Sequence, residues 1–269
     1  MDPATRHPPH LFPIAIKSVE IARSPRDTEG MIEEAVGVAR KLVEERYPQA
    51  RAAWLGGSVA RGTATPTSDL DITALLPGPP APLRESLRYA GWPVELFVHT
   101  EDSLAHYCEK DRQRRQPTMM RLVGETIVLI DTDGSGARLQ DSGKAQILAG
   151  PPPLPANDLA MLRYKISDLL EDLIGADSND VRTAVVSVLW QDATTLLLAG
   201  AEHWTGTGKG LLRELTAYDA THATDYATAL PTAVHAAGDG RPEAMITAVD
   251  SILEPYGGRL FAGFKLSGD

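Results

Sequence analysis

The sequence predicts an α/β (α+β) protein of two domains, a small mixed sheet with helices followed by a helical bundle. Three observations lead to this fold class. Short apolar runs of β-strand character are confined to the first half of the chain, apolar residues at helical spacing dominate the second half, and consecutive prolines separate the two. The length of 269 residues also suits two domains, because domains of roughly 100–150 residues are the commonest.

In the first domain we expect one long helix and four short strands. Residues 1–26 are rich in proline and lack clear periodicity, which predicts an N-terminal arm or an edge strand. Residues 28–47 place apolar side chains on one helical face and stop before Pro48, so an amphipathic helix packed on the sheet is expected. The expected strands are RAAWLGG at 51–57, DLDITALL at 69–76, WPVELFVH at 92–99 and ETIVLID at 125–131, separated by turns or helices.

The domain boundary is expected at GPPPLPAND, residues 150–158. Consecutive prolines favour an extended, stiff connection that neither a helix nor a central strand accepts. We therefore place the first domain at 27–149, a linker at 150–157 and the helical bundle at 158–269. Helices are expected from the three- and four-residue spacing that begins at Leu159, in the apolar run 181–200, and at 208–219 and 242–254.

Composition limits the setting and the partners. A net charge of −10 and a pI near 5.2 disfavour duplex nucleic acid and favour a cationic small molecule, although an acidic surface also serves solubility. Cys108 is the single cysteine, which excludes an intrachain disulfide. The segment MDPATRHPPH lacks the pattern of a secretory signal, and no run approaches the ~20 apolar residues of a membrane span. These features predict a cytoplasmic protein that has no membrane partner.

The stretch GGSVARGTATPTSDLDI, residues 56–72, carries the clearest chemical signal. Asp69 and Asp71 sit in an alternating strand, and strand geometry sends residues i and i+2 to the same face. Leu70 and Ile72 then face the opposite, buried side. Two carboxylates ~6 Å apart repel by about 3 kcal/mol at an effective dielectric constant of ~20, so a stable fold needs a compensating charge. We expect a divalent cation to supply it.

A third acid completes this prediction. Glu95 lies in the apolar strand 92–99, where a carboxylate needs a partner. If this strand lies beside 69–76, Glu95 joins Asp69 and Asp71 in a three-carboxylate metal site. An all-oxygen ligand set suits Mg²⁺ better than zinc or copper, and a site for one or two Mg²⁺ ions is typical of metal-assisted phosphoryl transfer.

The Gly-Gly-Ser turn is expected to hold a triphosphate. Gly56 and Gly57 lack a Cβ, so a phosphate can approach the backbone N–H groups closely. Ser58 offers its hydroxyl and begins the short helix SVAR, whose N-terminus would point at the anion. Arg61, one turn along, either supports that anion or pairs with a surface acid, and both interpretations stay open.

These residues resemble the nucleotidyltransferases of the DNA polymerase β-like superfamily, whose pattern is a hydrophobic strand, Gly-Gly/Ser, a spacer, Asp-x-Asp/Glu and a later strand acid. The matching residues are Gly57, Ser58, Asp69, Asp71 and Glu95. The resemblance is specific over residues 51–99. The succession of an α/β domain and a helical bundle is similar to the aminoglycoside and lincosamide nucleotidyltransferases, which implies their fold and two-metal chemistry.

Lys209 is the strongest candidate in the second half. In HWTGTGKGLLREL, residues 203–215, it follows a glycine-rich turn at the start of an expected helix, with Arg213 one turn later. Related antibiotic nucleotidyltransferases use a lysine from the helical domain to bind phosphates, so the resemblance implies that role for Lys209. The alternative for Lys209 and Arg213 is a solvated helix start.

Other polar residues are expected to be structural. The run EKDRQRRQP at 109–117 mixes both charges and predicts a solvated helix, although its arginines could touch phosphates. Asp192, and the acidic group Asp168, Glu171 and Asp172, either bind a cationic acceptor or solvate helices. His99, His106 and Cys108 show no metal or nucleophile signature.

The predicted function is a Mg²⁺-dependent transfer of an NMP group to an acceptor hydroxyl. The donor is ATP, which gives AMP, or another NTP, which gives the corresponding NMP. Gly57, Ser58, Arg61 and Lys209 would bind the nucleotide, and Asp69, Asp71 and Glu95 would be catalytic and hold metal. Glu95 is either a metal ligand or the base that takes the acceptor's proton. The favoured acceptor is a small antibiotic such as an aminoglycoside. The alternatives are a toxin–antitoxin-type enzyme that modifies protein or tRNA, and a non-catalytic nucleotide-binding regulator.

Overall fold

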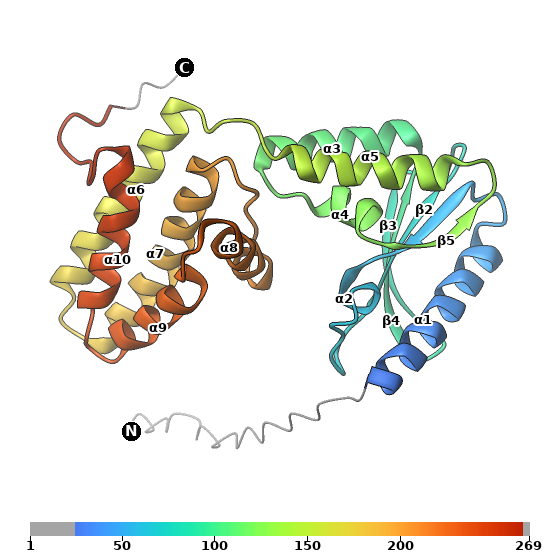
Figure 1. Cartoon of the computed structure of the whole chain (residues 1–269), viewed down its shortest axis with the longest axis horizontal. Coiled ribbons are helices and arrows are strands. Elements are labelled where there is room, and N and C mark those ends of the chain that lie inside the picture. Colours follow the sequence, from blue (N-terminus) through green and yellow to red (C-terminus); the bar gives the residue numbers. More distant parts are fainter. Residues whose placement is uncertain (1–24, 266–269) are drawn as a thin grey trace, which may run out of the picture.

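The computed structural model describes residues 25–265 of the chain. It consists of a sheet-containing half and an all-helical half that lie side by side (Figure 1). The arm predicted for residues 1–26 lies outside the described residues, except for its last two positions, which belong to the first helix. The predicted fold class, a mixed sheet with helices followed by a helical bundle, is confirmed.

A five-stranded mixed sheet forms the centre of the first half. Its strands are β1 (Ala52–Leu55), β2 (Leu70–Leu75), β3 (Leu83–Tyr89), β4 (Trp92–His99) and β5 (Ile127–Asp131), in the order β3-β4-β2-β1-β5. Strands β2 and β4 run parallel, whereas every other neighbouring pair is antiparallel. Four of these strands match the four predicted from sequence.

Strand β3 was not expected. It pairs with β4 through a two-residue turn, Ala90-Gly91, in which both residues have positive φ, as in the turns that suit tight hairpins. Its residues LRESLRY are charged and partly exposed because β3 is an edge strand with only one neighbour. Leu87 and Tyr89 pack, partly buried, against the apolar cluster, but Glu85 interrupts the alternation and no side chain of the strand is fully buried, so its sequence pattern is weak.

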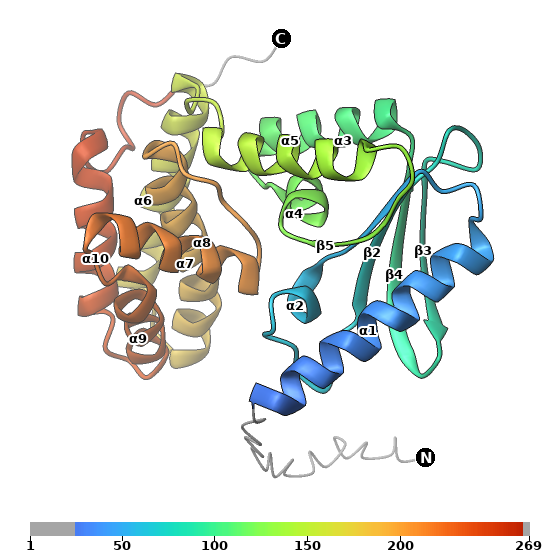
Figure 2. The ribbon, with the colours of Figure 1, turned by 45° about the vertical axis from the view of Figure 1, so that its right-hand side comes forward.

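Helices cover both faces of the sheet (Figure 2). On one face, α1 (Pro25–Arg46) packs its buried Ala35, Ala39, Leu42 and Val43 against alternate residues of the strands, including Leu70 and Ile72. On the other face lie α3 (Glu101–Arg114), α4 (Thr118–Gly124) and α5 (Ser135–Ala149), which form a second apolar cluster with the sheet. The single-turn helix α2 (Gly57–Ala60) follows β1.

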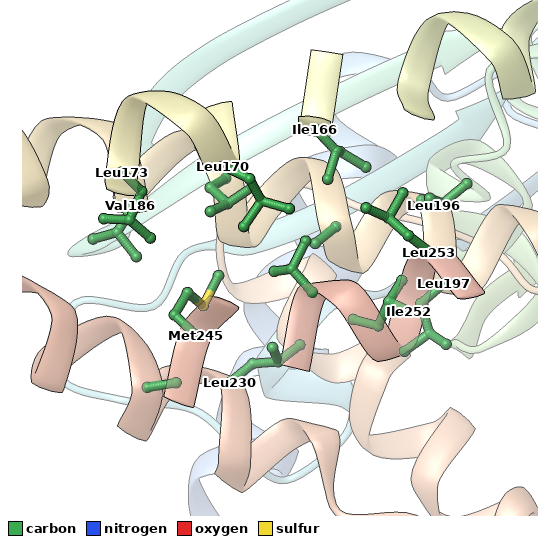
Figure 3. Close-up of a cluster of buried hydrophobic side chains, with 14 of the residues drawn as sticks. Ile166, Leu170, Leu173, Val186, Leu196, Leu197, Leu230, Met245, Ile252 and Leu253 are labelled. Atoms are coloured by element: carbon green, nitrogen blue, oxygen red, sulfur yellow. The ribbon is translucent and has the colours of Figure 1, made fainter. Parts of the chain in front are cut away.

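The second half is a bundle of five α-helices in the part of the chain that the structure describes. They are α6 (Ala156–Gly175), α7 (Asn179–Gly200), α8 (Lys209–His222), α9 (Tyr226–Gly238) and α10 (Glu243–Leu253), followed by the 3₁₀ turn Glu254–Tyr256. Their leucines, with Ile166, Val186, Met245 and Ile252, form a separate core (Figure 3). Helix α9 was not expected because Pro231 lies inside it, and the segment therefore lacks a continuous helical pattern.

Helix α7 is the central helix of this bundle. It is the one helix within residues 25–265 that is long and apolar enough to cross a membrane by length and composition. Its buried residues, among them Val186, Leu189 and Leu196, pack into the core shared with the other helices. The same composition is found in core helices of proteins that have no membrane span.

The two halves are joined twice. Residues 150–155 have no regular secondary structure and lead from α5 to α6, and the predicted domain boundaries at 150 and 157 remain predictions. The loop between α7 and α8 returns to the first half, where buried Trp204 joins the sheet-side apolar cluster and its indole N–H donates to the carbonyl oxygen of Ile147 at 2.7 Å. The backbone N–H of Thr205 donates to the carbonyl oxygen of Arg115 at 2.7 Å. These contacts fix α8 relative to the sheet.

Candidate active site

Three carboxylates converge at neighbouring strands. Strands β2 and β4 are paired in a register that sets Asp71 directly opposite Glu95, and Asp69 immediately precedes β2. One oxygen from each of Asp69, Asp71 and Glu95 lies within 4.8 Å of the others, and all three side chains are half-buried. Leu70 and Ile72 point to the opposite face and are fully buried. The predicted convergence of the three acids is therefore present.

The electrostatics of this cluster call for a cation. Burial, followed by repulsion from Asp69 and Glu95, raises the pKa of Asp71 to about 6. Within residues 25–265 this is the one group of three or more His, Cys, Asp or Glu side chains close enough to share a metal ion. The ligand set is entirely carboxylate, so the residues present fit a hard divalent cation such as Mg²⁺.

Gly57 makes room for the acid cluster. Its φ is +70°, a conformation that side chains with a Cβ rarely adopt, and a Cβ at this position would lie 1.9 Å from Oδ2 of Asp71. The neighbouring Gly56 donates its backbone N–H to the carbonyl oxygen of Asp71 at 2.8 Å. The glycine pair therefore holds the turn against Asp71, a steric role that the sequence interpretation, which considered only phosphate approach, did not include.

The polar spacer between Ser58 and Asp69 is an ordered loop. Ser58 donates its hydroxyl to the hydroxyl of Ser68 at 2.9 Å, and Ser68 in turn accepts the backbone N–H of Thr65 at 2.9 Å. The hydroxyl of Ser58 therefore reaches across the loop to the residue that precedes Asp69. The predicted short helix SVAR is present as the single turn α2, which begins one residue earlier, at Gly57.

Arg84 is a site residue that the sequence did not reveal. It extends from β3 and donates to both carboxylate oxygens of Glu95, at 3.1 and 2.9 Å. Its guanidinium carbon also lies 5.1 Å from the centre of the Phe97 ring, where a cation is attracted to the aromatic face. Glu95 was expected to need a partner, but Arg84 sits on the edge strand that sequence patterns missed.

The acid cluster opens into a cleft of about 650 Å³ between the two halves of the chain. Helix α8 faces α2 across this space (Figures 1 and 2). Five cationic side chains line the cleft together with the three acids, and these cations are Arg61, Arg84, Arg121, Lys209 and Arg213. The lining therefore holds more positive than negative side chains, in contrast to the net charge of −10 for the chain.

Two of these cations have no acidic partner. Among the described residues, neither Arg61 nor Lys209 lies within 4.0 Å of a carboxylate. Arg61 is exposed by surface area, yet the walls of the cleft desolvate it, and this desolvation together with repulsion from Arg213 lowers its pKa. An anion in the cleft would relieve both effects. Of the two interpretations of Arg61, pairing with a surface acid is not observed among the described residues.

The family follows from the sequence around these residues. Residues 38–115 match the model of a family described as the nucleotidyltransferase domain. The chain contains a nucleotidyltransferase domain. The matched segment includes the Gly-Gly-Ser turn, β2 and β4, so the resemblance to the DNA polymerase β-like superfamily is confirmed at the level of this domain.

Comparison with solved structures finds a match to the crystal structure of a nucleotidyltransferase-like protein from Exiguobacterium sibiricum. The sequence identity is 10 %, the match covers 82 % of this chain and 74 % of that one, and the TM-score is 0.42. None of the curated proteins compared with the chain is significantly similar to it.

A buried ion-pair network joins α4, in the sheet-containing half of the chain, to α8. Glu214 of α8, whose side chain is 6 % exposed, accepts from Arg121 of α4 at 2.9 Å and from Arg213 at 3.0 Å. Arg121 also donates to Glu125 at 2.7 Å. Because Arg121 and Arg213 both line the cleft, this network holds cations from the two halves near the acid cluster. Sequence patterns offered no signal for this long-range pairing.

The charged run 109–117 is only in part the solvated helix that was expected: residues 109–114 end α3 with mostly exposed side chains, but two charged residues are buried. Asp111 is buried, and its two oxygens accept from the Arg114 guanidinium and from the backbone N–H of Met119. Arg115 is also buried and donates to the carbonyl oxygen of Pro153 at 2.7 Å. The prediction was wrong for Asp111 and Arg115, because mixed charge in sequence does not distinguish solvated side chains from ones paired across a tertiary contact.

The remaining polar candidates lie outside the cleft. Asp192 pairs with Lys165 at 2.9 Å, and Glu171 pairs with Arg259 at 2.8 Å. His99 is buried with Nδ1 3.1 Å from the Ser103 hydroxyl, and burial lowers its pKa to about 4. Burial likewise raises the pKa of the Cys108 thiol to about 12. These contacts agree with structural roles.

Proposed function

We propose that the protein is a divalent-metal-dependent nucleotidyltransferase that transfers an NMP group, AMP from ATP, to a hydroxyl of an acceptor molecule. One observation carries the proposal. The three-carboxylate cluster of Asp69, Asp71 and Glu95 opens into the same cleft as the Gly-Gly-Ser turn and the unpaired cations Arg61 and Lys209. In a nucleoside triphosphate with bound metal, the metal ion would compensate the three carboxylates and the phosphates would compensate Arg61 and Lys209.

The metal would be held by the acid cluster. Asp69 and Asp71 are its proposed ligands, and Glu95 is either a third ligand or the base that accepts the acceptor's proton. When bound, one or two Mg²⁺ ions act as Lewis acids that offset charge on the reacting phosphate. The raised pKa of Asp71 supports this assignment, since a cluster of this kind is stabilised by a cation that neutralises it.

The chain's own side chains would bind and orient the triphosphate. Ser58, at the turn, and Arg61, which follows α2 as its C-cap, would approach it from the nucleotidyltransferase domain, and Lys209 and Arg213 would approach it from α8. Binding by these residues would hold the leaving pyrophosphate beside Arg61, Lys209 and Arg213. An acceptor hydroxyl could then attack the α-phosphorus in line from the side of Glu95.

The charges that line the cleft bear on the identity of the acceptor. An aminoglycoside was favoured from the acidic composition, but the acids lining the cleft are the three assigned to metal. The cationic lining instead favours an anionic partner, which keeps the tRNA alternative as a second candidate. Three of the five cations, Arg84, Arg121 and Arg213, are already paired with carboxylates, which favours a single triphosphate over a long polyanion.

The proposal is tested by transfer of label from NTPs. The purified protein, Mg²⁺ and each α-labelled NTP are incubated with a panel of aminoglycosides, lincosamides, hydroxy acids, tRNA and proteins. Asp71→Asn should reduce transfer by about 10³-fold or more, because it removes a proposed metal ligand worth several kcal/mol in the transition state. Asp141→Asn is the matched control, since its exposed carboxylate pairs with Lys144 on α5, outside the cleft.

A binding measurement separates fold from function. Mg²⁺ and MgATP should raise the thermal stability of the wild-type protein and of Asp141→Asn, and should raise that of Asp71→Asn far less. Label transfer by Asp71→Asn at the wild-type rate would remove the assignment of the site. MgATP binding without transfer to any acceptor would instead favour the non-catalytic regulator.

A further inference from the structure

A second cavity adjoins the cleft. It has a volume of about 370 Å³ and lies between β3, β4, α3 and α4. Four residues, Arg84, Phe97, Thr118 and Leu122, line both the cavity and the cleft, so the two spaces are continuous. None of the residues proposed to bind the triphosphate lines the cavity. Its size is in the range of small-molecule sites.

Strand β4 leads from the acid cluster into this cavity. Glu95, Phe97 and His99 occupy alternate positions and point to one face, whereas Val94, Leu96 and Val98 pack into the apolar cluster on the other. Alternate residues of a strand are about 6.5–7 Å apart, so Phe97 is one step and His99 two steps beyond Glu95. A molecule lying along this row would present one end to the acid cluster and its other end to the cavity.

The walls of the cavity are apolar and aromatic. Phe97 forms its floor, and Leu83 and Tyr107 line it with 38 % and 39 % of their surface exposed. Met119 and Leu122 add apolar surface from α4. Exposed large apolar side chains around a concave site are typical of ligand binding, and a flat ring would bury most surface against Phe97 and Tyr107.

The charge of the cavity favours an anion. Its one acid, Asp111, has both oxygens engaged by Arg114 and by the backbone of Met119. His99 is neutral at pH 7, because burial lowers its pKa to about 4. The guanidinium groups of Arg84 and Arg114 each form one ion pair through a single nitrogen, with Glu95 and Asp111 respectively. Their side chains are 64 % and 54 % exposed, so the other N–H donors of each guanidinium are open to a ligand carboxylate. No uncommitted carboxylate is offered to the ammonium groups of a polycation.

We propose that this cavity binds the acceptor of the transfer reaction, and that the acceptor is an aromatic hydroxy acid. Its ring would lie on Phe97, its carboxylate would face Arg114 and its hydroxyl would face Glu95. The hydroxyl oxygen forms a bond to the α-phosphorus, and the bond between that phosphorus and the bridging oxygen breaks. Pyrophosphate leaves with the electron pair, and the hydroxyl proton passes to Glu95 or to solvent. This inference rests on the proposed function.

The test uses a matched pair of fluorescent probes that differ in charge. One is 6-hydroxy-2-naphthoate and the other is 6-(aminomethyl)-2-naphthol, which has the same ring and hydroxyl but carries an ammonium group. Binding of each is measured by naphthol fluorescence, and binding of MgATP by calorimetry, on the same preparations. The naphthoate should bind about tenfold or more tightly than the amine, as expected for a carboxylate facing an arginine.

Two substitutions at the mouth of the cavity locate the probe. Tyr107→Ala should weaken naphthoate binding about tenfold, because it removes an aromatic wall from an exposed position with little effect on folding. Leu83→Glu adds an acid at the other side and should reverse the preference in favour of the amine. Leu148→Ala, which removes an apolar side chain that is 90 % exposed on α5, is the control and should change none of these affinities.

The outcomes distinguish this inference from the proposed function. Tighter binding of the amine, or naphthoate binding that Tyr107→Ala leaves unchanged, overturns the assignment of the cavity. Weakened MgATP binding in Tyr107→Ala overturns it too, because the cavity would then hold the nucleoside. If MgATP fails to bind the wild-type protein while naphthoate binding still depends on Tyr107 and Leu83, the proposed function fails and the anionic ring site remains.

Discussion

Replacement of Gly57 by alanine should disable the site, whereas the same change at its neighbour Gly56 should not. At Gly57 the new Cβ would lie 1.9 Å from Oδ2 of Asp71, and real Cβ contacts below 3.0 Å are essentially never found. At Gly56 the nearest atoms are side-chain methyl groups of Thr126 and Leu122, at 3.3 and 3.4 Å. The two glycines are adjacent in sequence, so they form a closely matched pair.

The magnitude follows from geometry. The Asp71 carboxylate must withdraw by about 1.1 Å to restore a 3.0 Å contact, and a misplacement of ~1 Å at a reacting centre costs on the order of 10²-fold in rate. The φ of +70° adds roughly 1–2 kcal/mol of backbone strain for alanine. Gly56 has φ −111° and ψ −153°, in the extended region open to any residue, so Gly56→Ala should cost less than about 1 kcal/mol.

The assay needs no knowledge of the acceptor. MgATP affinity is measured by calorimetry and the free energy of unfolding by denaturant titration, for wild type, Gly57→Ala and Gly56→Ala. We expect Gly57→Ala to bind MgATP more than about tenfold more weakly and to lose ~1–3 kcal/mol of stability. Gly56→Ala should stay within about threefold of wild type in affinity. Wild-type binding by Gly57→Ala, or equal damage in both variants, would refute the steric role of Gly57.

Three further predictions concern charge and burial. Without metal, stability should fall as pH rises from about 4 through 6 and level off above about 7, because the Asp71 pKa of about 6 exceeds its unfolded value of 3.8 and only between these values does the folded state bind an extra proton. The loss is at most about 3 kcal/mol in denaturant titrations, and either Asp71→Asn or Mg²⁺ should abolish it. Glu214→Ala should lower the free energy of unfolding by ~3–5 kcal/mol and weaken MgATP binding, because it leaves Arg121 and Arg213 without their buried partner. An equal effect of Glu171→Ala on both measurements would contradict this. Cys108 should react with a thiol reagent at pH 8 only as fast as the protein unfolds, because its buried thiol has a pKa of about 12.

Local sequence patterns were sufficient for the acid cluster. The alternation in DLDI sends Asp69 and Asp71 to one side and Leu70 and Ile72 to the other, since side chains in a strand repeat every two residues. Glu95 was identified because a carboxylate within an apolar strand needs a partner. Helical spacing likewise predicted most of the bundle, and proline limited the prediction only at α9, where Pro231 lies inside the helix.

Residues that act through long-range contacts were not accessible in this way. Arg84 lies on a charged edge strand whose apolar alternation is interrupted by Glu85, and its contact with Glu95 exists only because β3 pairs with β4. Arg121 and Glu214 are 93 positions apart and meet because the loop around Trp204 docks α8 on the nucleotidyltransferase domain. Asp111 was placed in solvent because a charged run does not show which of its members a tertiary contact buries.

Local sequence patterns therefore identified three carboxylates on neighbouring strands, a glycine turn and a lysine of the helical half as a phosphate-binding candidate. The spacing of apolar residues and the composition of a segment are local properties, so they predict a strand or helix without knowledge of the rest of the fold. The tertiary structure alone decided which cations face the acids, why Gly57 has to be glycine, and that a ring-lined cavity adjoins the cleft. Those features depend on side chains from distant segments packing within a few ångströms of one another, and no local pattern records that packing.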